Sequence, residues 1–285
     1  VATLMERIAA PRPAWVARPR LMGVVNVTPD SFSDGGLNLD PAAALVRCEA
    51  LAAAGADILD IGGESTRPGA APVPPAEELA RVRPVLEGLR ARRDRLPGVL
   101  VSIDTRHAAV MRAALEAGVD IINDVTALAG DPDSLGVAAA SPAYVVLTHM
   151  RGTPQTMNVA PAYDDVALDV FDELEARVEA CVAAGIARER LVVDPGLGFG
   201  KRGRHNLAIL RALPLFHGLG CPILIGASRK GLGGGLSELP PRERVPSSLA
   251  AAFHALACGV QILRVHDVAE TRQVVALWTA LSQGG

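Results

Sequence analysis

Polar and charged side chains recur within or directly after short apolar segments of this chain. These residues are Asn26, Asp60, Asp104, Asn123, Asp124, His149, Asp194, Ser228, Arg229, Lys230, Arg264 and His266. Carboxylates and carboxamides accept hydrogen bonds from neighbouring N–H and NH2 groups, whereas arginine and histidine donate to anions. Because gathering charge at one rim costs desolvation without a structural return, the pattern indicates a functional site.

Two kinds of ligand group suit these residues. The acceptors are Asp104, Asn123 and Asp194. A carboxylate that meets a guanidine-like edge forms two parallel hydrogen bonds, so these residues predict an aminated heterocycle deep in the site. The donors and cations are Arg67, Arg264 and His266, with Asn26 close by. They predict a phosphate or pyrophosphate near the rim, and together the two sets indicate a transferase or isomerase of a phosphorylated heterocycle.

Several polar residues also have a structural interpretation. Asp60 and Asp124 could be buried acids that accept backbone hydrogen bonds. Asp267 and Glu270 form a capping-box-like pair at a predicted helix start. His149 and His266 fit a packing role as well as a site role. The other histidines fall in or near predicted helices and are expected at the surface or in packing: His107, His205, His217 and His254.

The glycine-rich segment 196–203 does not match a phosphate-binding P-loop, because no serine or threonine follows Lys201. We expect a flexible loop whose glycines let the backbone approach a flat ligand. The chain contains neither a G-x-S-x-G nucleophile elbow nor an H-E-x-x-H zinc motif. Serine hydrolase and zinc protease chemistry therefore have no support.

Eight short apolar segments must position the polar residues. We predict strands at 21–25, 58–61, 99–103, 121–122, 144–147, 191–193, 223–225 and 262–265. Near-continuous Val/Ile/Leu runs are typical of parallel strands that are covered on both faces. Segments of helical character alternate with them. One such segment begins at Asp40 and Pro41, and another carries Glu77 and Glu78 in its first turn.

This alternation predicts an α/β protein with a single (β/α)8 TIM barrel. The carboxyl ends of all strands then face one mouth, where the active sites of this fold lie. A doubly wound open sheet is the main alternative, but NVTPDSFSDGG (26–36) lacks a dinucleotide-binding glycine fingerprint. We expect one barrel domain over residues 21–285, preceded by an N-terminal extension or lead-in over residues 1–20.

The composition excludes several functional classes. The chain has 285 residues, of which 49% are hydrophobic, 21% charged and 3% aromatic, with a net charge of -3. These values argue against a nucleic-acid binder with a basic surface and against disorder. No apolar run approaches the ~18 residues of a membrane span, and residues 1–20 lack a secretory signal pattern. We therefore expect no nucleic-acid or membrane partner.

Cysteine and lysine usage adds two expectations. The cysteines, Cys48, Cys181, Cys221 and Cys258, form no C-x-x-C pair, so we expect reduced thiols in a cytoplasmic protein. Only two of the 28 basic residues are lysines, Lys201 and Lys230. Both follow predicted strands at the expected mouth. Lys201 could stand there by chance.

Eight motifs resemble those of the dihydropteroate synthases. In chain order they are LMGVVNVTPDSFSDGG (21–36), DIGGESTRPGA (60–70), SIDTR (102–106), INDVTAL (122–128), THMRGTPQTM (148–157), DPGLGFGK (194–201), GASRKG (226–231) and RVHDVAET (264–271). The resemblance implies a transferase that condenses 6-hydroxymethyl-7,8-dihydropterin pyrophosphate with 4-aminobenzoate, giving 7,8-dihydropteroate and pyrophosphate in folate biosynthesis. It also implies Mg2+, competition by sulfonamides, and a homodimer.

The resemblance assigns residues to three subsites. For the pterin it implies Asp104, Asn123, Val125, Met150, Asp194, Phe199, Gly226 and Lys230. For the pyrophosphate it implies Asn26, Arg67, Arg264 and His266, with Asn26 near the Mg2+ ion. For the aminobenzoate it implies Phe32, Thr66, Pro68, Ser228, Lys230 and Arg264. The implied catalytic set is Asp104, Lys230, Arg67, Arg264 and His266.

The resemblance also implies a mechanism in which the C–O bond ionises before the arylamine attacks, so no strong base is needed. The loops at 29–36 and 66–74 are expected to close over the site. One alternative is a methyltetrahydrofolate:corrinoid methyltransferase, which would not need the T-R-P-G, S-R-K and R-V-H-D segments. Another is a non-catalytic homologue, which would have lost residues of the anion site.

Overall fold

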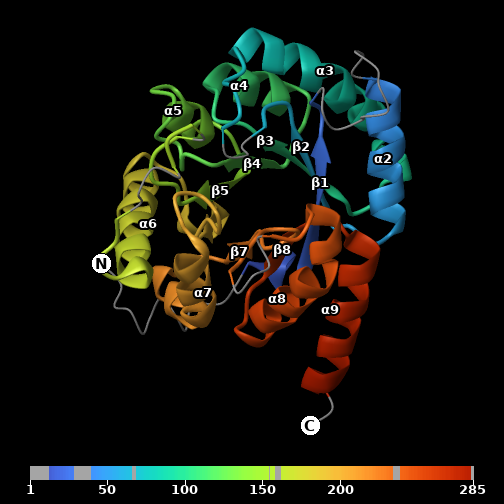
Figure 1. Ribbon diagram of the computed structural model, residues 1–285. Helices are drawn as coiled ribbons and strands as arrows, with labels where there is room; N and C mark the ends of the chain where they lie inside the picture. Colours follow the sequence, from blue (N-terminus) through green and yellow to red (C-terminus); the bar gives the residue numbers. More distant parts are fainter. Residues whose placement is uncertain are drawn as a thin grey trace.

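A parallel sheet of eight strands forms the centre of the molecule. The computed structural model describes residues 13–28, 40–65, 69–153, 155–157, 162–233 and 238–283. The strands are β1 (Arg20–Asn26), β2 (Ile58–Gly62), β3 (Leu100–Asp104), β4 (Ile121–Asp124), β5 (Tyr144–Thr148), β6 (Leu191–Asp194), β7 (Leu224–Ile225) and β8 (Ile262–Val265). Their order is β6-β5-β4-β3-β2-β1-β8-β7, and a parallel bridge between Val193 and Ile223 joins the two edges. The predicted barrel is confirmed (Figure 1).

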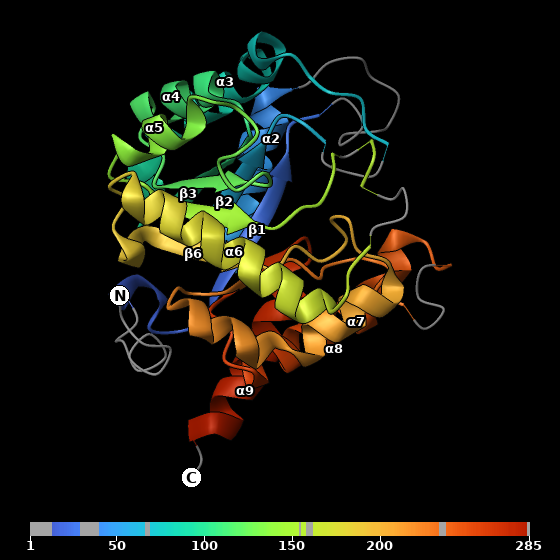
Figure 2. The same cartoon turned by 90° about the vertical axis from the view of Figure 1, so that its left-hand side faces the viewer.

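Helices cover the outside of this barrel (Figures 1 and 2). They are α2 (Pro41–Ala53), α3 (Pro75–Ala91), α4 (Ala108–Glu116), α5 (Ser134–Ala139), α6 (Val166–Ala183), α7 (Gly203–Arg211), α8 (Val245–Ala257) and α9 (Val268–Gln283). Short 3-10 segments lie at Ala14–Val16, Arg93–Arg95, Arg188–Arg190, Leu213–Leu219 and Pro241–Arg244. The predicted start of α2 is confirmed, because the Ala42 N–H donates to Asp40 Oδ1 at 2.9 Å.

Several strands end one or two residues later than the apolar pattern predicts. The added residues are polar: Asn26, Asp104, Asn123, Asp124, Thr148 and Asp194. Backbone pairing continues through these residues, as the pairings of Asn26 with Gly62 and of Thr148 with Asp194 show. The apolar pattern stops at the first polar side chain, whereas the backbone ladder depends only on N–H and C=O groups and continues past it. The polar side chains are therefore held on the strands themselves.

Side chains that point into the barrel form an apolar layer below and a polar layer above. The lower layer contains Met22, Ile58, Ile121, Val146, Val192, Leu224 and Ile262. Residues two positions apart on a strand point to the same side. Two positions after members of this layer come Asp60, Asn123, Thr148, Asp194, Gly226 and Arg264. The apolar layer thus supports the polar residues from beneath.

The segment before β1 packs against the amino-terminal end of the barrel. Val16 belongs to the lower apolar layer, and the Trp15 ring lies 4.4 Å from the Tyr144 ring, centroid to centroid. This part of the lead-in therefore covers the bottom of the barrel, a role that the sequence does not indicate. The division between residues 20 and 21 stays a prediction. Among the described residues, no helix has the length and apolar character needed to cross a membrane.

Candidate active site at the carboxyl ends of the strands

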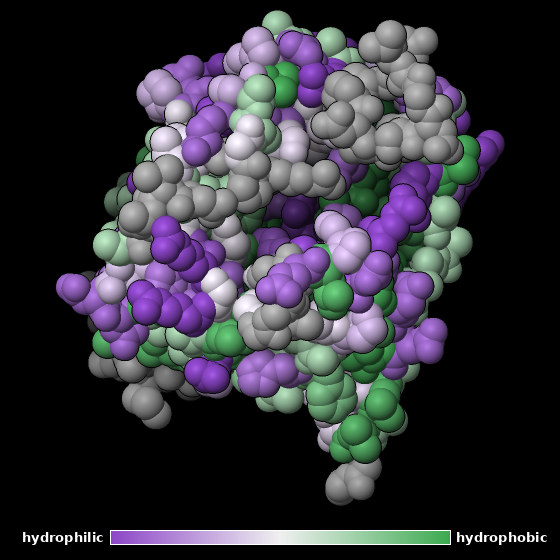
Figure 3. All heavy atoms as spheres, in the orientation of Figure 1, coloured by the Kyte–Doolittle hydropathy of each residue, from purple (hydrophilic) through white to green (hydrophobic). Residues whose placement is uncertain are grey.

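Three acceptor side chains from three strands lie buried at the mouth of the barrel. Asp104 ends β3, Asn123 lies on β4 and Asp194 ends β6. None is more than 7% exposed, and Asp104 pairs with Asn123 in the strand register. Figure 3 shows this face of the molecule hollowed near its centre, with hydrophilic residues lining the depression. The predicted acceptors are thus brought to one end of the barrel.

Arg264 on β8 links two of the buried acids. Its Nε donates to Asp60 Oδ2 at 2.7 Å, and its Nη2 donates to Asp104 Oδ2 at 2.6 Å. Burial raises the pKa of Asp104 to about 7; Arg264 opposes this rise, whereas the carboxylate of Asp60 adds to it. The guanidinium therefore lies among the acceptors, and its predicted contact with an anion stays a prediction.

Asp60 orients two neighbouring site residues. It is fully buried, and its Oδ2 accepts from Asn123 Nδ2 at 3.1 Å as well as from Arg264. Its Oδ1 has no hydrogen-bond partner in the described part of the chain. The expected burial of Asp60 is confirmed, but the expectation that backbone N–H groups satisfy it is wrong, because its partners are the side chains of Asn123 and Arg264. Asp60 lies two residues after Ile58, whose side chain points into the barrel. This spacing indicates that the Asp60 side chain also points into the barrel, towards the site.

Asp124, by contrast, serves the turn that follows β4. Its Oδ1 accepts from the N–H and the hydroxyl of Thr126 at 2.7 Å each, and its Oδ2 accepts from the Leu128 N–H at 3.0 Å. Ala127 and Leu128 have positive φ angles of 52° and 60°. The carboxylate therefore stabilises a strained turn, as the structural interpretation of Asp124 predicts.

Lys230 lies between the acceptors and the glycine-rich loop. Its Nζ donates to the Leu197 carbonyl and lies 4.7 Å from the centre of the Phe199 ring. Burial lowers the pKa of Lys230 to about 8, although Asp194 opposes this shift. A Cβ added to Gly226 would lie 3.8 Å from Lys230 Nζ and 3.9 Å from Arg264 Cβ. Gly226 thus lies beside both cations.

The remaining pterin residues implied by the resemblance lie on segments that follow the central strands. Val125, directly after β4, is buried, whereas Met150 and Phe199 are half-buried. Asp194 connects to the same loop, because its Oδ1 accepts from the Gly196 N–H at 2.8 Å. Burial raises the pKa of Asp194, and the charge of Lys230 opposes this rise. Apolar and polar groups are therefore both available to a flat heterocycle.

Ser228 and His266 form a second polar group at the mouth. The backbone N–H of His266 donates to Ser228 Oγ at 3.1 Å, and His266 Nδ1 lies 3.1 Å from the same oxygen. Burial, together with Arg264, lowers the pKa of His266 to about 4. His266 is therefore neutral near pH 7, which differs from the positive charge that the sequence analysis assigns to it. A neutral imidazole still donates one hydrogen bond to an anion.

Asp267 pairs with a neighbouring arginine at the edge of the site. Its carboxylate accepts from two nitrogens of Arg229, one of them at 2.9 Å. Arg229 has a positive φ angle of 59°, and its N–H donates to Ser248 Oγ at 2.8 Å. The carboxylate of Asp267, whose predicted capping of α9 stays a prediction, therefore fixes the turn between Ser228 and Lys230.

Four of the predicted site residues lie outside the described part of the chain: Phe32, Thr66, Arg67 and Pro68. Their roles stay predictions. Asn26 is described, and it ends β1 half-buried beside Gly62 of β2. It belongs to the same end of the barrel as the acceptors.

A model of the pterin binding enzymes matches residues 22–266, from β1 to the residue after β8. The chain belongs to the pterin-binding enzyme family. Two proteins with similar sequences are the dihydropteroate synthases of two bacteria. That of Neisseria meningitidis serogroup B is 48% identical over 270 residues, which cover 93% of each chain. That of Escherichia coli K12 is 45% identical over 256 residues, covering 90% of this chain and 89% of the relative.

Solved structures of dihydropteroate synthases are similar to this pterin-binding enzyme along nearly its whole length. The Yersinia pestis synthase in a sulfonamide drug complex has a TM-score of 0.87 and 45% identity, covering 94% of this chain and 95% of that one. The Xanthomonas albilineans synthase in complex with 7,8-dihydropteroate has a TM-score of 0.84 and 45% identity, with the same coverage. The resemblance drawn from the motifs is therefore confirmed.

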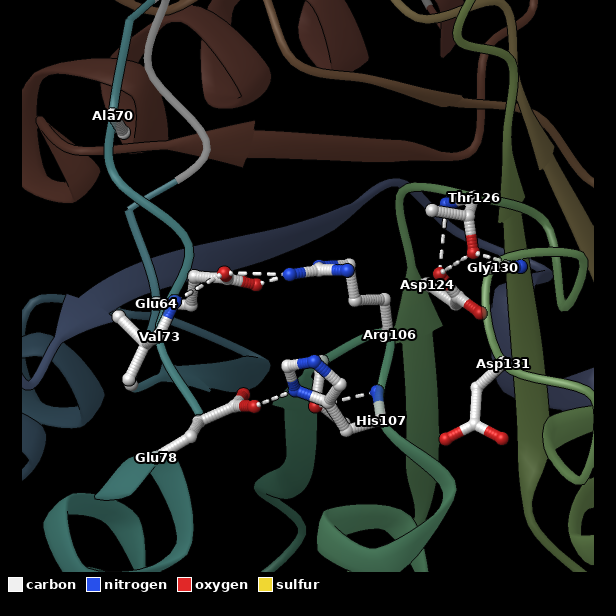
Figure 4. A network of polar contacts seen from close by, with 12 residues as sticks. Glu64, Ala70, Val73, Glu78, Arg106, His107, Asp124, Thr126, Gly130 and Asp131 are labelled. Atoms are coloured by element: carbon white, nitrogen blue, oxygen red, sulfur yellow. Dashed lines mark hydrogen bonds and ion pairs between the residues drawn. The ribbon is translucent and has the colours of Figure 1, made fainter. Parts of the chain in front are cut away.

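Beside the mouth of this pterin-binding enzyme, a polar network joins the segments after β2 and β3 to α3 (Figure 4). Arg106 donates through Nε and Nη2 to the two oxygens of Glu64, both at 2.9 Å. Glu64 also accepts from the Val73 N–H at 2.9 Å. The neighbouring pair is Glu78, which is fully buried, and His107, whose Nδ1 lies 2.6 Å from Glu78 Oε2.

This network has the residue types of a metal site but a different arrangement. Ligand atoms of Glu64, Glu78 and His107 lie within 4.8 Å of one another. However, both oxygens of Glu64 already bind the guanidinium of Arg106, whose positive charge repels a cation. The network is therefore better explained as a structural one. The sequence does not indicate this network, because Glu78 and His107 are 29 residues apart and neither position points to a partner.

Proposed function

We propose that this chain is a dihydropteroate synthase. It is a transferase that joins 6-hydroxymethyl-7,8-dihydropterin pyrophosphate to 4-aminobenzoate and releases pyrophosphate. The observation that carries the proposal is the buried set of Asp104, Asn123 and Asp194, in a barrel that is 45% to 48% identical to synthases over about nine tenths of its length. These side chains offer the acceptors that the amino and ring N–H groups of a pterin need.

The pterin would bind against the inner wall of the mouth. Asp194 would accept from the guanidine-like edge of the ring, and Asn123 would bind a neighbouring ring atom. Lys230, held between Leu197 and Phe199, would donate to a ring acceptor through a compact ammonium. Val125, Met150 and Phe199 would pack on the faces of the ring.

The chemistry begins when the bond between the pterin methylene carbon and the pyrophosphate oxygen breaks, and the oxygen leaves with both electrons. The carboxylate of Asp104 stabilises the positive charge that develops on the pterin. The amine nitrogen of 4-aminobenzoate then forms the new bond to the methylene carbon and loses a proton to water. Because the cation is a strong electrophile, an arylamine can attack it without a dedicated base.

Pyrophosphate would leave on the side of Asn26, Arg67, Arg264 and His266. Arg264 would have to exchange one carboxylate contact for a phosphate oxygen, and His266 would donate through its neutral ring. The aminobenzoate would bind near the outer part of the mouth, against Phe32, Thr66, Pro68 and Ser228, the stem of Lys230 and Arg264. Sulfonamides would compete for this subsite.

We also propose Mg2+ as the cofactor, with Asn26 as its protein ligand. Mg2+ prefers oxygen ligands and commonly keeps several waters while binding one or two protein groups and substrate phosphates. Asn26 ends β1 at the same end of the barrel as the acceptors and is half-buried there, so its carboxamide oxygen would be the protein ligand. The bound ion would neutralise charge on the departing pyrophosphate.

Mg2+ dependence tests this assignment. Asn26→Ala should raise the Mg2+ concentration needed for half-maximal rate by about tenfold or more, a scale reached even by outer-shell changes at metal sites. The measurement is a Mg2+ titration of initial rate after chelator treatment. The thermal unfolding temperature serves as the control and should not change. An unaltered Mg2+ requirement in the variant would remove Asn26 from the metal site.

The reaction itself is tested by mixing the protein with Mg2+, the pterin pyrophosphate and 4-aminobenzoate, and by measuring dihydropteroate and pyrophosphate. Equal amounts of both products are expected. Absence of turnover by folded protein would overturn the proposal. Methyl transfer from methyltetrahydrofolate to a corrinoid is the alternative, and the names of the relatives above do not favour it.

The ionisation of Lys230 should limit the rate at alkaline pH. Because burial lowers the pKa of Lys230 from its ordinary 10.5 to about 8 in the folded protein, kcat/KM should fall about tenfold per pH unit above pH 8. Between pH 8 and 10.5 Lys230 binds more protons in the unfolded chain than in the folded protein. The contribution of Lys230 to the free energy of unfolding therefore rises with pH while activity falls. Rates and urea unfolding between pH 6.5 and about 9.5 would measure both trends.

Lys230→Arg provides the matched control, because an arginine keeps its charge over this range. The variant should be slower at pH 7 and should show no decline above pH 8. An unchanged alkaline decline in the variant would assign the titration to another group.

We further propose that the enzyme is cytoplasmic, as its cysteine usage indicates, and that it is a homodimer, as its resemblance to the family implies. All four cysteines are free thiols in the structure, in keeping with a reducing compartment. Sedimentation analysis would measure the oligomeric state.

A further inference from the structure

Lys201 is a buried lysine to which the proposed reaction assigns no role. Its side chain is 3% exposed, at the end of the glycine-rich loop that follows β6. Its Nζ lies within hydrogen-bond distance of four acceptors: His149 Nδ1 at 2.8 Å and the carbonyl oxygens of Gly196 at 3.0 Å, Phe199 at 3.0 Å and His149 at 3.3 Å. The three N–H groups of an ammonium are shared among these four acceptors. One ammonium group thus joins the end of β5 to both ends of the loop.

The two segments joined by Lys201 carry residues expected at the pterin. Met150 directly follows His149, and Phe199 is itself a partner of Lys201. Between Gly196 and Phe199 lies Leu197, whose carbonyl accepts from Lys230. A displacement of this loop would therefore move Phe199, Lys230 and the N–H that binds Asp194.

The loop and the β5 segment approach each other too closely for side chains at two glycines. A Cβ on Gly196 would lie 2.0 Å from the His149 carbonyl oxygen, and one on Gly200 would lie 2.6 Å from the Arg151 carbonyl oxygen. Both glycines have positive φ angles, 71° and 65°. These two glycines therefore allow the two chain segments to lie in contact. The expectation of a flexible loop is wrong, because the loop is held near Gly196 and near Gly200.

The groups around Lys201 are arranged to accept from a cation. Burial, followed by the charge of Lys201, lowers the pKa of His149 to about 4, so its neutral ring accepts at Nδ1. His149 Nε2 can then donate to Glu173 at 2.9 Å, and Glu173 also binds Arg151. Burial lowers the pKa of Lys201 to about 7; Asp194 and Glu173 oppose this shift, whereas Lys230 and Arg151 favour it.

We propose that Lys201 is a positioning residue, which holds segments 149–151 and 196–200 together so that the pterin pocket is formed before substrate binds. This inference rests on the proposed function for its kinetic consequence. It explains why one of only two lysines stands at this position: four acceptors surround a space that a compact ammonium fills and a planar guanidinium does not.

Lys201→Met keeps the length of the side chain and removes the donors. Below pH 7, where Lys201 is protonated, we expect the KM for the pterin pyrophosphate to rise by about tenfold or more, because several charge-assisted hydrogen bonds are lost. The KM for 4-aminobenzoate and kcat should stay within about threefold of the wild-type values. Arg202→Met is the matched control, since it removes a neighbouring exposed cation and should change neither KM.

Tyr163→Phe is a milder second variant, in case Lys201→Met folds poorly. The Tyr163 hydroxyl donates to the Gly200 carbonyl at 3.0 Å, so the variant removes one contact from the other side of the same loop. It should raise the pterin KM by a smaller factor, about threefold, again without altering the aminobenzoate KM.

Hydrogen exchange of the backbone amides at 194–200 gives a readout that needs no substrate. Exchange should be faster in Lys201→Met than in the wild type and unchanged in Arg202→Met. If the wild type makes no dihydropteroate, the proposed function fails and the exchange result alone decides the inference. Unchanged exchange at 194–200, an unchanged pterin KM, or equal losses for both substrates would overturn the positioning role.

Discussion

Asp194→Asn should lower kcat/KM for the pterin substrate by about a thousandfold, or ~4 kcal/mol of transition-state stabilisation. The carboxylate offers acceptors only, whereas an amide that keeps its oxygen towards the Gly196 N–H must present its NH2 group to the pterin. Two donors would then face each other in a buried site. A site built around hydrogen bonds rejects such a mismatch strongly. Steady-state kinetics with varied pterin pyrophosphate would measure the loss.

The same variant should be at least as stable as the wild type near pH 7. Burial raises the pKa of Asp194, so the folded protein holds a proton at this residue more tightly than the unfolded chain does. Its contribution to the free energy of unfolding therefore decreases as pH rises above the unfolded pKa, and an uncharged asparagine does not have this effect. Thermal unfolding between pH 5 and pH 8 would detect the difference.

Asp124→Asn is the matched control for Asp194→Asn. Asp124 is also a buried acid at the end of a strand, but both its oxygens bind the turn after β4. The variant should lose about 1 to 3 kcal/mol of unfolding free energy, because an NH2 group would face a backbone N–H. Its pterin KM should stay near the wild-type value. If Asp124→Asn impaired pterin binding and Asp194→Asn lowered only the stability, the assignment of Asp194 to the site and of Asp124 to the turn would be wrong.

Arg264→Met should reduce the free energy of unfolding by about 3 to 5 kcal/mol at pH 8, because it leaves two buried acids without their shared cation. Asp60 and Asp104 each accept one hydrogen bond from this guanidinium. The loss should be smaller at pH 5.5. Since the pKa of Asp104 is already raised to about 7, this acid can take up a proton instead of keeping its charge. Urea unfolding at both pH values would measure the effect.

Two further variants separate the causes of this loss. Asp60→Asn combined with Arg264→Met should recover part of the stability, because one unpaired charge is removed, but it should not recover activity. Arg229→Met breaks a more exposed pair with Asp267 and should cost much less stability. If Arg264→Met unfolds at the wild-type urea concentration at pH 8, the bridge between the two acids is not a major stabilising interaction.

The barrel and most of the ring of polar residues could be predicted from the sequence. Continuous apolar runs followed by a polar residue report burial and the end of a strand, which are local properties. The partners of those residues are not local. Arg264 and Asp60 are 204 residues apart, and only the closed barrel brings them within 2.7 Å. The residues around Asp60 therefore predict that it lies in the interior, but they do not indicate what it binds.

The sequence also does not indicate the charge states of the titratable side chains in the site. His266 follows a strand and looks like a cation for an anion site, but burial beside Arg264 keeps it neutral. Lys201 illustrates the same limit, since its place in the sequence is compatible with chance, whereas its four acceptors show that it joins two segments. A residue type indicates which interactions are available, whereas desolvation and neighbours decide which of them occur.

The scarcity of lysine gives this protein a chemical selectivity of its own. Its two lysines are Lys201, which is enclosed, and Lys230, which is half-buried in the site with its pKa lowered to about 8. An amine-reactive electrophile at mildly alkaline pH therefore meets one lysine side chain that is both unprotonated and reachable. A ligand in the pterin pocket would shield that amine. Covalent labelling of a single side chain would then report how much of the enzyme is occupied, without any engineered tag.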